Sequence, residues 1–466
     1  MEPRPKQQKT SADDRRALTQ RVCVHFDINE TILVGDPAGG DSFEESLNKV
    51  LAKVAFVKAA PPEAQKGGRW PEWTWHDGSP LDPDLRAPDA PLPPLLTEAF
   101  ADPPGCKRFY NVKALKGPFA KKFTEASSPG SIYRAKFESL RNSLKWPEDV
   151  AVDSRLCSEE GYYHIMPAFF QTLASLRTSG KPFTVVLRTF GTDLPRVQQA
   201  INAFAEGAHP LHKGAVCPDL ALPDSRMWRG RYGAADGGFT LIPYEEDSAL
   251  DSLREGVSIV TESPTSVHAT RAPSDTSAIG ANGNGNGAAN GRDSAPLPSR
   301  GPSNVPTPRR ESILDEGAML AELQGAYDGP PRVSAVQDDY SWWKGAGYAP
   351  SSGKPLWLTY EPEAPCAWRH LFFDDNIHHD AKDSIVAVRA RRRAGEPFKP
   401  VSGESTIKLH ATVLLKVPTV KPIMEPGWFL EQLDACGARY EALRSGRATG
   451  EDGSSFAKML ELTQSA

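Results

Sequence analysis

Three short apolar segments of this 466-residue chain end in polar side chains, and this feature constrains the fold most strongly. The segments span 21–27, 183–189 and 370–375, and they end in Asp27, in Thr189, and in Asp374 with Asp375. Segments of this length and composition are typical of buried β-strands. Because ligands bind at the carboxyl ends of strands in a parallel α/β sheet, these polar ends predict one shared site.

Helices are expected between these strands. Ser42 and Glu45 form a capping box ahead of apolar residues at helical spacing. The same spacing predicts a helix from Glu159 to about Leu176, and Pro195 marks the first turn of another. Further elements are expected as short helices near 131–145 and 312–324, strands near 355–360 and 384–388, and a helix at 429–443. The alternation of strands and helices predicts an α/β fold with a mostly parallel sheet.

The composition changes along the chain and predicts its division. A domain core is expected from 21–58, 156–261 and 313–416, interrupted by an irregular, Pro- and Trp-rich insertion at 59–155 and followed by a helical extension at 417–466. The polar tail 1–20 and the low-complexity stretch 262–312 are expected to be disordered. Such segments bury too little apolar surface to offset the entropy of ordering them.

The charge, the lengths of the apolar runs and the cysteines argue against several classes of protein. A net charge of −5 lacks the basic excess of a dedicated nucleic-acid binder. No apolar run reaches the roughly 18 residues of a membrane span. The six cysteines form no C-x-x-C pair, which argues against a zinc cage or a disulfide scaffold. We therefore expect no nucleic-acid or membrane partner and a reducing, cytoplasmic location.

The polar strand ends suggest phosphate chemistry. A strand-end carboxylate such as Asp27 can act as an oxygen nucleophile. It must approach a negatively charged phosphate, and Mg²⁺ bound by carboxylates would cancel the repulsion. Asp374 and Asp375 are the candidate partners for that ion, and Thr189 can bond a phosphate oxygen. A lysine should complete the site, and Lys354 is preferred over two alternatives, Lys344 and Lys382.

This pattern resembles the haloacid dehalogenase (HAD) superfamily, whose four motifs are Asp-x-Asp-x-Thr, a Thr or Ser ending a strand, a Lys, and a pair of acids. The matching residues are Asp27 with Thr31, Thr189, Lys354, and Asp374 with Asp375. The turn 27–32 is similar to the Asp-Leu-Asp-Glu-Thr-Leu of the carboxy-terminal-domain phosphatase branch. The resemblance covers about 21–58, 156–210 and 313–390, less than half of the chain.

The resemblance implies a Rossmann-like parallel sheet flanked by helices, with a cap-type insertion. Asp27 would be the nucleophile and a magnesium ligand, and the backbone carbonyl of Asn29 a second ligand. Asp375 would be the main acidic ligand, with Asp374 beside it. Thr189 and Lys354 would orient and neutralise the phosphoryl group. The substrate-binding set would be Thr31, Thr189 and Arg188. The implied partner is a small phosphorylated molecule or a phosphoprotein.

Asn29 departs from this pattern, because it stands where phosphatases of the superfamily carry their general acid/base. An amide cannot shuttle protons, and general acid–base catalysis contributes about 10²–10⁴-fold. Three functions therefore stay open: a phosphatase with weakened acid/base catalysis, a catalytically degenerate binding protein, and a dehalogenase-type enzyme that acts on carbon without Mg²⁺.

Other polar or aromatic clusters have ordinary interpretations. The pair His378 and His379 is expected to be a solvated helix start rather than a metal site. The Trp-rich stretch 70–75 and the pair 342–343 are expected to pack in a core rather than line a substrate pocket. The arginine-rich run 389–393 is expected to lie on the surface.

Overall fold

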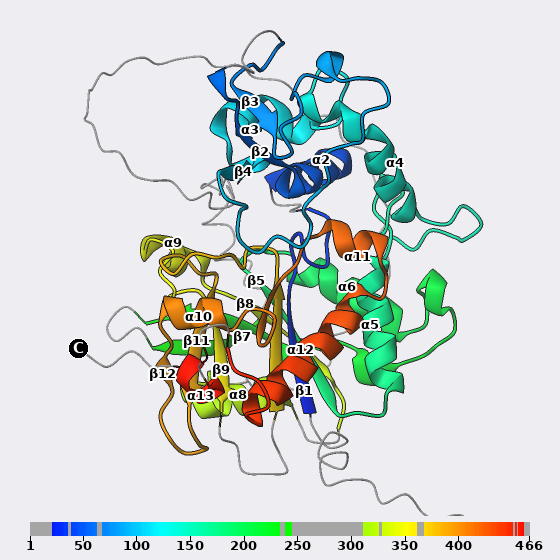
Figure 1. Ribbon diagram of the computed structural model, residues 1–466. Helices are drawn as coiled ribbons and strands as arrows, with labels where there is room; N and C mark the ends of the chain where they lie inside the picture. The colour runs from blue at the N-terminus through cyan, green and yellow to red at the C-terminus, as the bar shows by residue number, and fades with distance from the viewer. Residues whose placement is uncertain are drawn as a thin grey trace, which may run out of the picture. The chain divides into compact units, whose positions relative to one another are not determined.

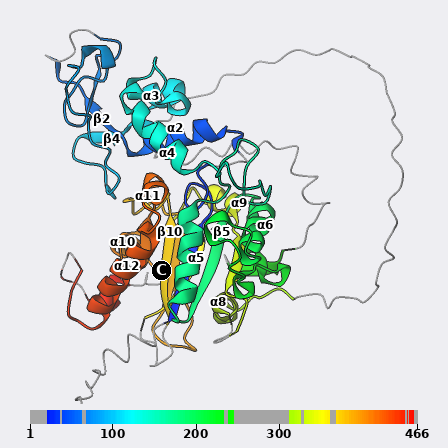
Figure 2. The same cartoon turned by 90° about the vertical axis from the view of Figure 1, so that its right-hand side faces the viewer.

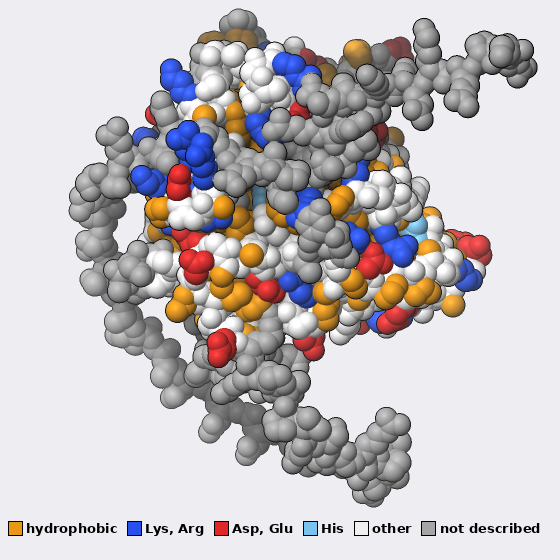
Figure 3. All heavy atoms as spheres, turned by 90° about the horizontal axis from the view of Figure 1, so that it is seen from below, with side chains coloured by type: hydrophobic (Ala, Val, Ile, Leu, Met, Phe, Trp, Pro, Cys, Tyr) orange, Lys and Arg blue, Asp and Glu red, His pale blue; other side chains and the backbone are white. Residues whose placement is uncertain are grey.

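The computed structural model describes residues 21–35, 39–62, 68–233, 238–244, 311–325, 329–360, 368–450, 453 and 455–460. The expected disordered tail 1–20 lies outside these ranges, as does nearly all of the expected loop 262–312. Apart from Glu311, the described residues belong to one compact unit. On the face seen in Figure 3, acidic and basic side chains are interspersed with apolar ones.

A seven-stranded mixed sheet forms the centre of the fold, with strand order β13-β10-β1-β5-β8-β6-β7 (Figure 1). Its strands are β1 Arg21–Asp27, β5 Phe183–Thr189, β6 Met227–Tyr232, β7 Phe239–Pro243, β8 Val333–Gln337, β10 Trp368–Asp374 and β13 Leu414–Lys416. Within the described chain, β7 runs antiparallel to β6 and the other neighbouring strands pair in parallel. The α/β class is therefore confirmed, and the carboxyl ends of β1, β5 and β10 lie along one edge.

Three helices cover one face of this sheet, namely α5 Pro167–Thr178, α6 Leu194–Ala205 and α12 Trp428–Arg444 (Figure 2). Alternate residues of β1 contact these helices, because successive side chains of a strand point to opposite faces of the sheet. The ring of Phe26 meets those of Phe169 and Phe429 edge to face, each at 5.2 Å between centroids. The helical extension predicted at 417–466 therefore contributes α12 to the main hydrophobic core.

A second sheet and a helix cover the opposite face. The sheet has the order β12-β11-β9, formed by β9 Lys354–Thr359, β11 Val386–Arg391 and β12 Lys399–Pro400, and the helix is α8 Glu316–Gln324. Trp357 of β9 and Leu320 of α8 pack in one cluster with Cys23 and Val186 of the main sheet. This layer brings the start of β9 to the face of the main sheet that carries Asp27.

The insertion was expected to be irregular, but it contains a small sheet and helices, and its apolar side chains pack in one cluster that also includes Val420 and Ile423. It contains an antiparallel sheet β3-β2-β4, formed by β2 Phe56–Ala59, β3 Trp73–Trp75 and β4 Cys106–Arg108, and the helices α2 Phe43–Val54, α3 Lys113–Phe119 and α4 Arg134–Ser143. Trp75 is fully buried against Phe109, as expected for a packing residue. Leu47 and Leu51 of α2 belong to the same cluster. Helix α2, which precedes the predicted boundary at 58/59, therefore packs with residues of the insertion.

Two further expectations are corrected. The helix predicted from Glu159 begins only at Pro167, and Tyr162 instead stacks on Phe43 at 3.8 Å. The strand expected at 384–388 is β11 at 386–391, which joins the second sheet. Strands β6, β7 and β8 were not predicted.

The remaining elements are short. The helices are α9 Tyr340–Gly345, α10 Gly403–Lys408, α11 Val420–Met424 and α13 Phe456–Met459. The 3-10 helices are η3 Pro83–Leu85, η4 Phe109–Asn111, η5 Ala120–Lys122, η6 Pro129–Tyr133, η7 Pro210–His212, η8 Pro218–Leu220 and η9 Asp224–Arg226. None of the helices in the described ranges is long and apolar enough to cross a membrane.

Candidate metal centre and active site

Three buried carboxylates meet at the carboxyl ends of β1 and β10. Asp27 ends β1, Asp374 ends β10, and Asp375 follows it. One oxygen from each carboxylate lies within 4.8 Å of the other two. The parallel pairing of β1 with β10 causes this arrangement, because it places the ends of two strands about 350 residues apart side by side. The predicted acidic residues are thus together, and a set of carboxylate oxygens fits the ligand preference of Mg²⁺.

Lys354 crosses from the second sheet to two of these carboxylates. Its Nζ lies 2.5 Å from Oδ1 of Asp27 and 2.8 Å from Oδ2 of Asp374. Its side chain is 1 % exposed. The two alternatives, Lys344 and Lys382, are exposed. The structure therefore places only Lys354 of these three candidates among the carboxylates.

Thr31 connects the two acidic strand ends. Its Oγ1 donates to Oδ2 of Asp27 at 3.3 Å and accepts the backbone N–H of Asp375 at 3.2 Å. The turn after β1 folds back to make this possible, since the N–H groups of Ile32 and Leu33 both donate to the carbonyl of Ile28. Thr31 is fully buried, so its observed contacts are with the site's own residues.

Asn29 is hydrogen-bonded to a carboxylate that the sequence did not single out. Its Nδ2 donates to Oδ2 of Asp193 at 3.0 Å. A Cβ atom placed on Gly191 would lie 2.4 Å from Oδ2 of Asp193 and 3.3 Å from both Asn29 Nδ2 and Thr189 Oγ1. Three polar groups therefore converge on Gly191, and the absence of a side chain there leaves room for them.

Thr189 ends β5 next to Asn29 and Asp193, and two backbone N–H groups fix its position. Its Oγ1 accepts the N–H of Gly191 at 2.9 Å, and its carbonyl accepts the N–H of Asp338 at 2.6 Å. The hydroxyl proton of Thr189 can therefore be donated to another acceptor.

Arg188 has a structural role that argues against the predicted contact with substrate. Its guanidinium donates to both oxygens of Asp338, at 2.5 and 2.9 Å, and to the carbonyl of Pro355 at 2.9 Å. The residue is 0 % exposed. Arg188 thus joins β5 to the segment after β8 and to β9, and a bound substrate would have to displace these partners.

The insertion supplies a cation to the site. Nζ of Lys53, on α2, lies 3.2 Å from Oδ2 of Asp375 and forms an ion pair with Glu30. On the other side, Lys416 donates to the carbonyls of Asp375 and Ile377, each at 3.1 Å. Burial lowers the pKa of Lys416 to about 7. No local pattern marks Lys53 as a site residue, because a lysine on an amphipathic helix is ordinarily solvated.

Negative charge exceeds positive charge at this site. Burial and the charges of Asp374 and Asp375 raise the pKa of Asp27 well above its ordinary value, although Lys354 opposes the shift. Burial likewise raises the pKa of Asp374. Burial disfavours the charge of Lys354, but the two carboxylates outweigh it and raise its pKa. A divalent cation would relieve this excess, and this is the electrostatic reason to place one here.

The other clusters match their ordinary interpretations only in part. Among the described residues, no helix begins at the pair His378 and His379, where a helix start was expected. Nε2 of His378 lies 3.6 Å from a carboxylate oxygen of Asp383, and His379 contacts the ring of Phe100. Trp343 is buried, in agreement with a packing role. Within the arginine-rich run, Arg389 is paired with Glu316, so the start of the run lies in a strand rather than on a free surface.

Comparisons of the chain with protein-family models, with curated proteins and with solved structures found no match.

Proposed function

We propose that this protein is a HAD-like, Mg²⁺-dependent hydrolase of phosphoric monoesters that works through an aspartyl-phosphate intermediate. The observation that carries the proposal is the buried group of Asp27, Asp374 and Asp375 with Lys354 bonded into it. The largely parallel sheet, with Thr189 at the end of the neighbouring strand, supports a Rossmann-like arrangement of the HAD type. Mg²⁺ bound by the three carboxylates would supply charge neutralisation for an incoming phosphate.

Each residue then has a defined task. A carboxylate oxygen of Asp27 forms a bond to phosphorus while the bond from phosphorus to the ester oxygen breaks. Lys354 holds Asp27 in place and reduces the repulsion between the two anions. Thr189 donates its hydroxyl proton to a phosphoryl oxygen. Water then attacks the acyl phosphate, which releases inorganic phosphate and restores Asp27.

Asp193 is our candidate for the proton transfers that Asn29 cannot make. The departing alkoxide needs a proton in the first step, and the attacking water must lose one in the second. The carboxylate of Asp193 is bonded to the side chain of Asn29, which stands at the usual acid/base position. In this account Asn29 positions the carboxylate of Asp193, and Asp193 carries the proton.

The second candidate function is a binding protein that kept the fold and lost turnover. The observation that favours it is Asn29, whose amide replaces a titratable group. This protein would bind Mg²⁺ and a phosphate mimic without releasing phosphate. A dehalogenase-type enzyme would instead release halide without Mg²⁺.

Phosphate release from a panel of phosphomonoesters, measured with Mg²⁺ and with a chelator, separates these functions. The proposal expects release that needs Mg²⁺ and is lost in Asp27→Asn, with Lys344→Met as an exposed control. Release that persists in Asp27→Asn would remove Asp27 as the nucleophile. Mg²⁺-dependent thermal stabilisation by a phosphate mimic without turnover would favour the binding protein.

The proposed substrates are a small phosphorylated molecule or a phosphoprotein, and the proposed location is the cytoplasm. The five cysteines in the described ranges are all free thiols, which supports a reducing compartment.

A further inference from the structure

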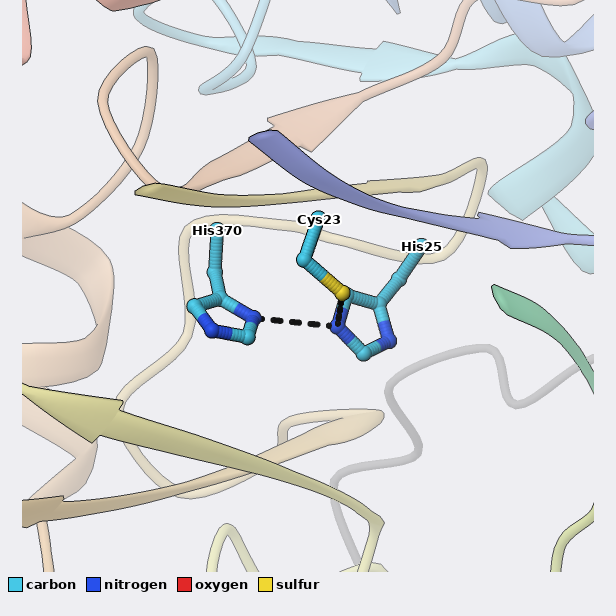
Figure 4. Close-up of side chains that lie close together, drawn as sticks. All are labelled: Cys23, His25 and His370. Atoms are coloured by element: carbon cyan, nitrogen blue, oxygen red, sulfur yellow. Dashed lines mark hydrogen bonds between the residues drawn. The ribbon is translucent and has the colours of Figure 1, made fainter. Parts of the chain in front are cut away.

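A second group of potential metal ligands lies inside the fold, apart from the carboxylates. It consists of Cys23, His25 and His370 (Figure 4). One ligand atom from each residue lies within 4.8 Å of the others, and all three residues are buried. The proposed hydrolase chemistry uses none of them.

The strands bring these residues together. Cys23 and His25 are two apart on β1 and therefore point to the same face of the sheet. His370 is the partner of Cys23 in the parallel pairing of β1 with β10. This face is covered by α8 and the second sheet, and Cys23 packs in the same cluster as Trp357. The group is thus held by regular structure on both sides.

Two of the separations fit the edges of a tetrahedral metal site. Nε2 of His25 lies 3.2 Å from Nδ1 of His370 and 3.5 Å from Sγ of Cys23. With metal bonds of about 2.0 Å to nitrogen and about 2.3 Å to sulfur, these edges correspond to angles of about 106° and about 109° at a central ion. Figure 4 shows the sulfur and both rings directed toward one another.

Side chains around the group hold one ring and leave a nitrogen of the other without a partner. Nε2 of the Gln324 amide lies 3.0 Å from Nε2 of His370, the ring nitrogen that faces away from His25. Among the described residues, Nδ1 of His25 has no hydrogen-bond partner, although it is buried. Two arginines whose charges act on Cys23 are already paired, Arg188 with Asp338 and Arg226 with Glu322.

We propose that Cys23, His25 and His370 bind one Zn²⁺ ion that joins β1 to β10 as a structural site. Binding forms one Zn–S and two Zn–N bonds and releases the thiol proton of Cys23 to solvent. Because the group is buried, the ion enters as the chain folds. Thiolate and imidazole ligands select Zn²⁺, whereas the carboxylates at the strand ends select Mg²⁺, so the two sites differ in their metal. This site does not depend on the proposed hydrolase function.

Zinc K-edge absorption of the full chain, produced in zinc-supplemented medium and desalted, tests the proposal directly. We expect about one zinc per chain, with one sulfur at about 2.3 Å and nitrogen at about 2.0 Å. Oxygen ligands alone would place the ion at the carboxylates and overturn the proposal. Protein that retains no zinc would also overturn it.

The unaltered protein and single-residue variants, each loaded with Co²⁺ in place of Zn²⁺, identify the ligands independently. A thiolate-to-Co²⁺ charge-transfer band should appear in the near ultraviolet and disappear in Cys23→Ser. It should persist in Cys157→Ser, a matched control at another buried thiol. It should also persist in Asp27→Asn, which alters the carboxylate site. A band that survives in folded Cys23→Ser would contradict the assignment, and if that variant does not fold, the zinc spectrum of the unaltered chain decides.

Discussion

Nζ of Lys354 lies 2.5 Å from Oδ1 of Asp27, although 327 residues separate them in the chain. Lys354 begins β9 of the second sheet, and Asp27 ends β1 of the main sheet. The ion pair therefore connects two layers of the fold at the place where we propose the chemistry occurs. The same contact is expected to serve stability and catalysis.

Lys354→Met should destabilise the protein by about 3–5 kcal/mol, because it leaves buried carboxylates without their cation. Urea unfolding at neutral pH measures this change, and added Mg²⁺ should recover part of the loss. Lys344→Met, at an exposed position, should change stability by less than about 0.5 kcal/mol. Equal effects of the two substitutions would contradict the role given to Lys354.

Mg²⁺ should stabilise the protein more as the pH rises. The folded-state pKa of Asp27 is raised above 3.8. The folded metal-free chain therefore holds this proton more tightly than the unfolded chain, and the stability it contributes is lost as pH rises through the raised pKa. Mg²⁺ relieves the cost of ionisation. The free energy of unfolding should be measured at several pH values with Mg²⁺ and with a chelator. The difference between the two should grow as the pH rises from acid values, and it should grow less in Asp27→Asn. A difference that does not change with pH would count against a metal at the carboxylates of Asp27, Asp374 and Asp375.

Asp193→Asn should lower kcat/KM by about 10²–10⁴-fold for esters with alkyl leaving groups. The loss should be smaller for p-nitrophenyl phosphate, because nitrophenolate departs without a proton. Glu206→Gln, at the other end of α6, is the control. An equal loss with both kinds of ester would show that Asp193 has only a structural role.

Gly191→Ala should lower activity by up to about 10²-fold while the protein stays folded. The new Cβ would lie 2.4 Å from Oδ2 of Asp193, so that carboxylate must move. Gly117→Ala is the matched control, since a Cβ there has no atom within 4 Å. Unchanged activity in Gly191→Ala would show that catalysis does not depend on the position of Asp193.

The sequence predicted the strand ends because their signal is local. A short apolar run that ends in a carboxylate, as at Asp27 and Asp374, is visible without knowledge of its neighbours. Lys354 was preferred because it lies shortly before the second acidic strand in the sequence. Strand β8 was missed because VSAVQ is short and part polar, although it lies fully buried beside β5.

Contacts between distant segments were beyond the reach of local patterns. The periodicity of α2 shows which of its faces is buried but not that residues of the insertion cover it. Lys53 and Asp375 are 322 residues apart, and no spacing links them. Arg188 was assigned to substrate, but it adjoins Thr189 in β5, and successive strand residues point to opposite faces.

The role proposed for Asp27 is decided by comparing Mg²⁺-dependent phosphate release by the unaltered chain and by Asp27→Asn on the same phosphomonoester. We expect release that a chelator abolishes and that falls by at least about 10³-fold in the variant, because Asp27 forms the covalent intermediate. Release that is independent of Mg²⁺, or that survives in folded Asp27→Asn, would rule out this role.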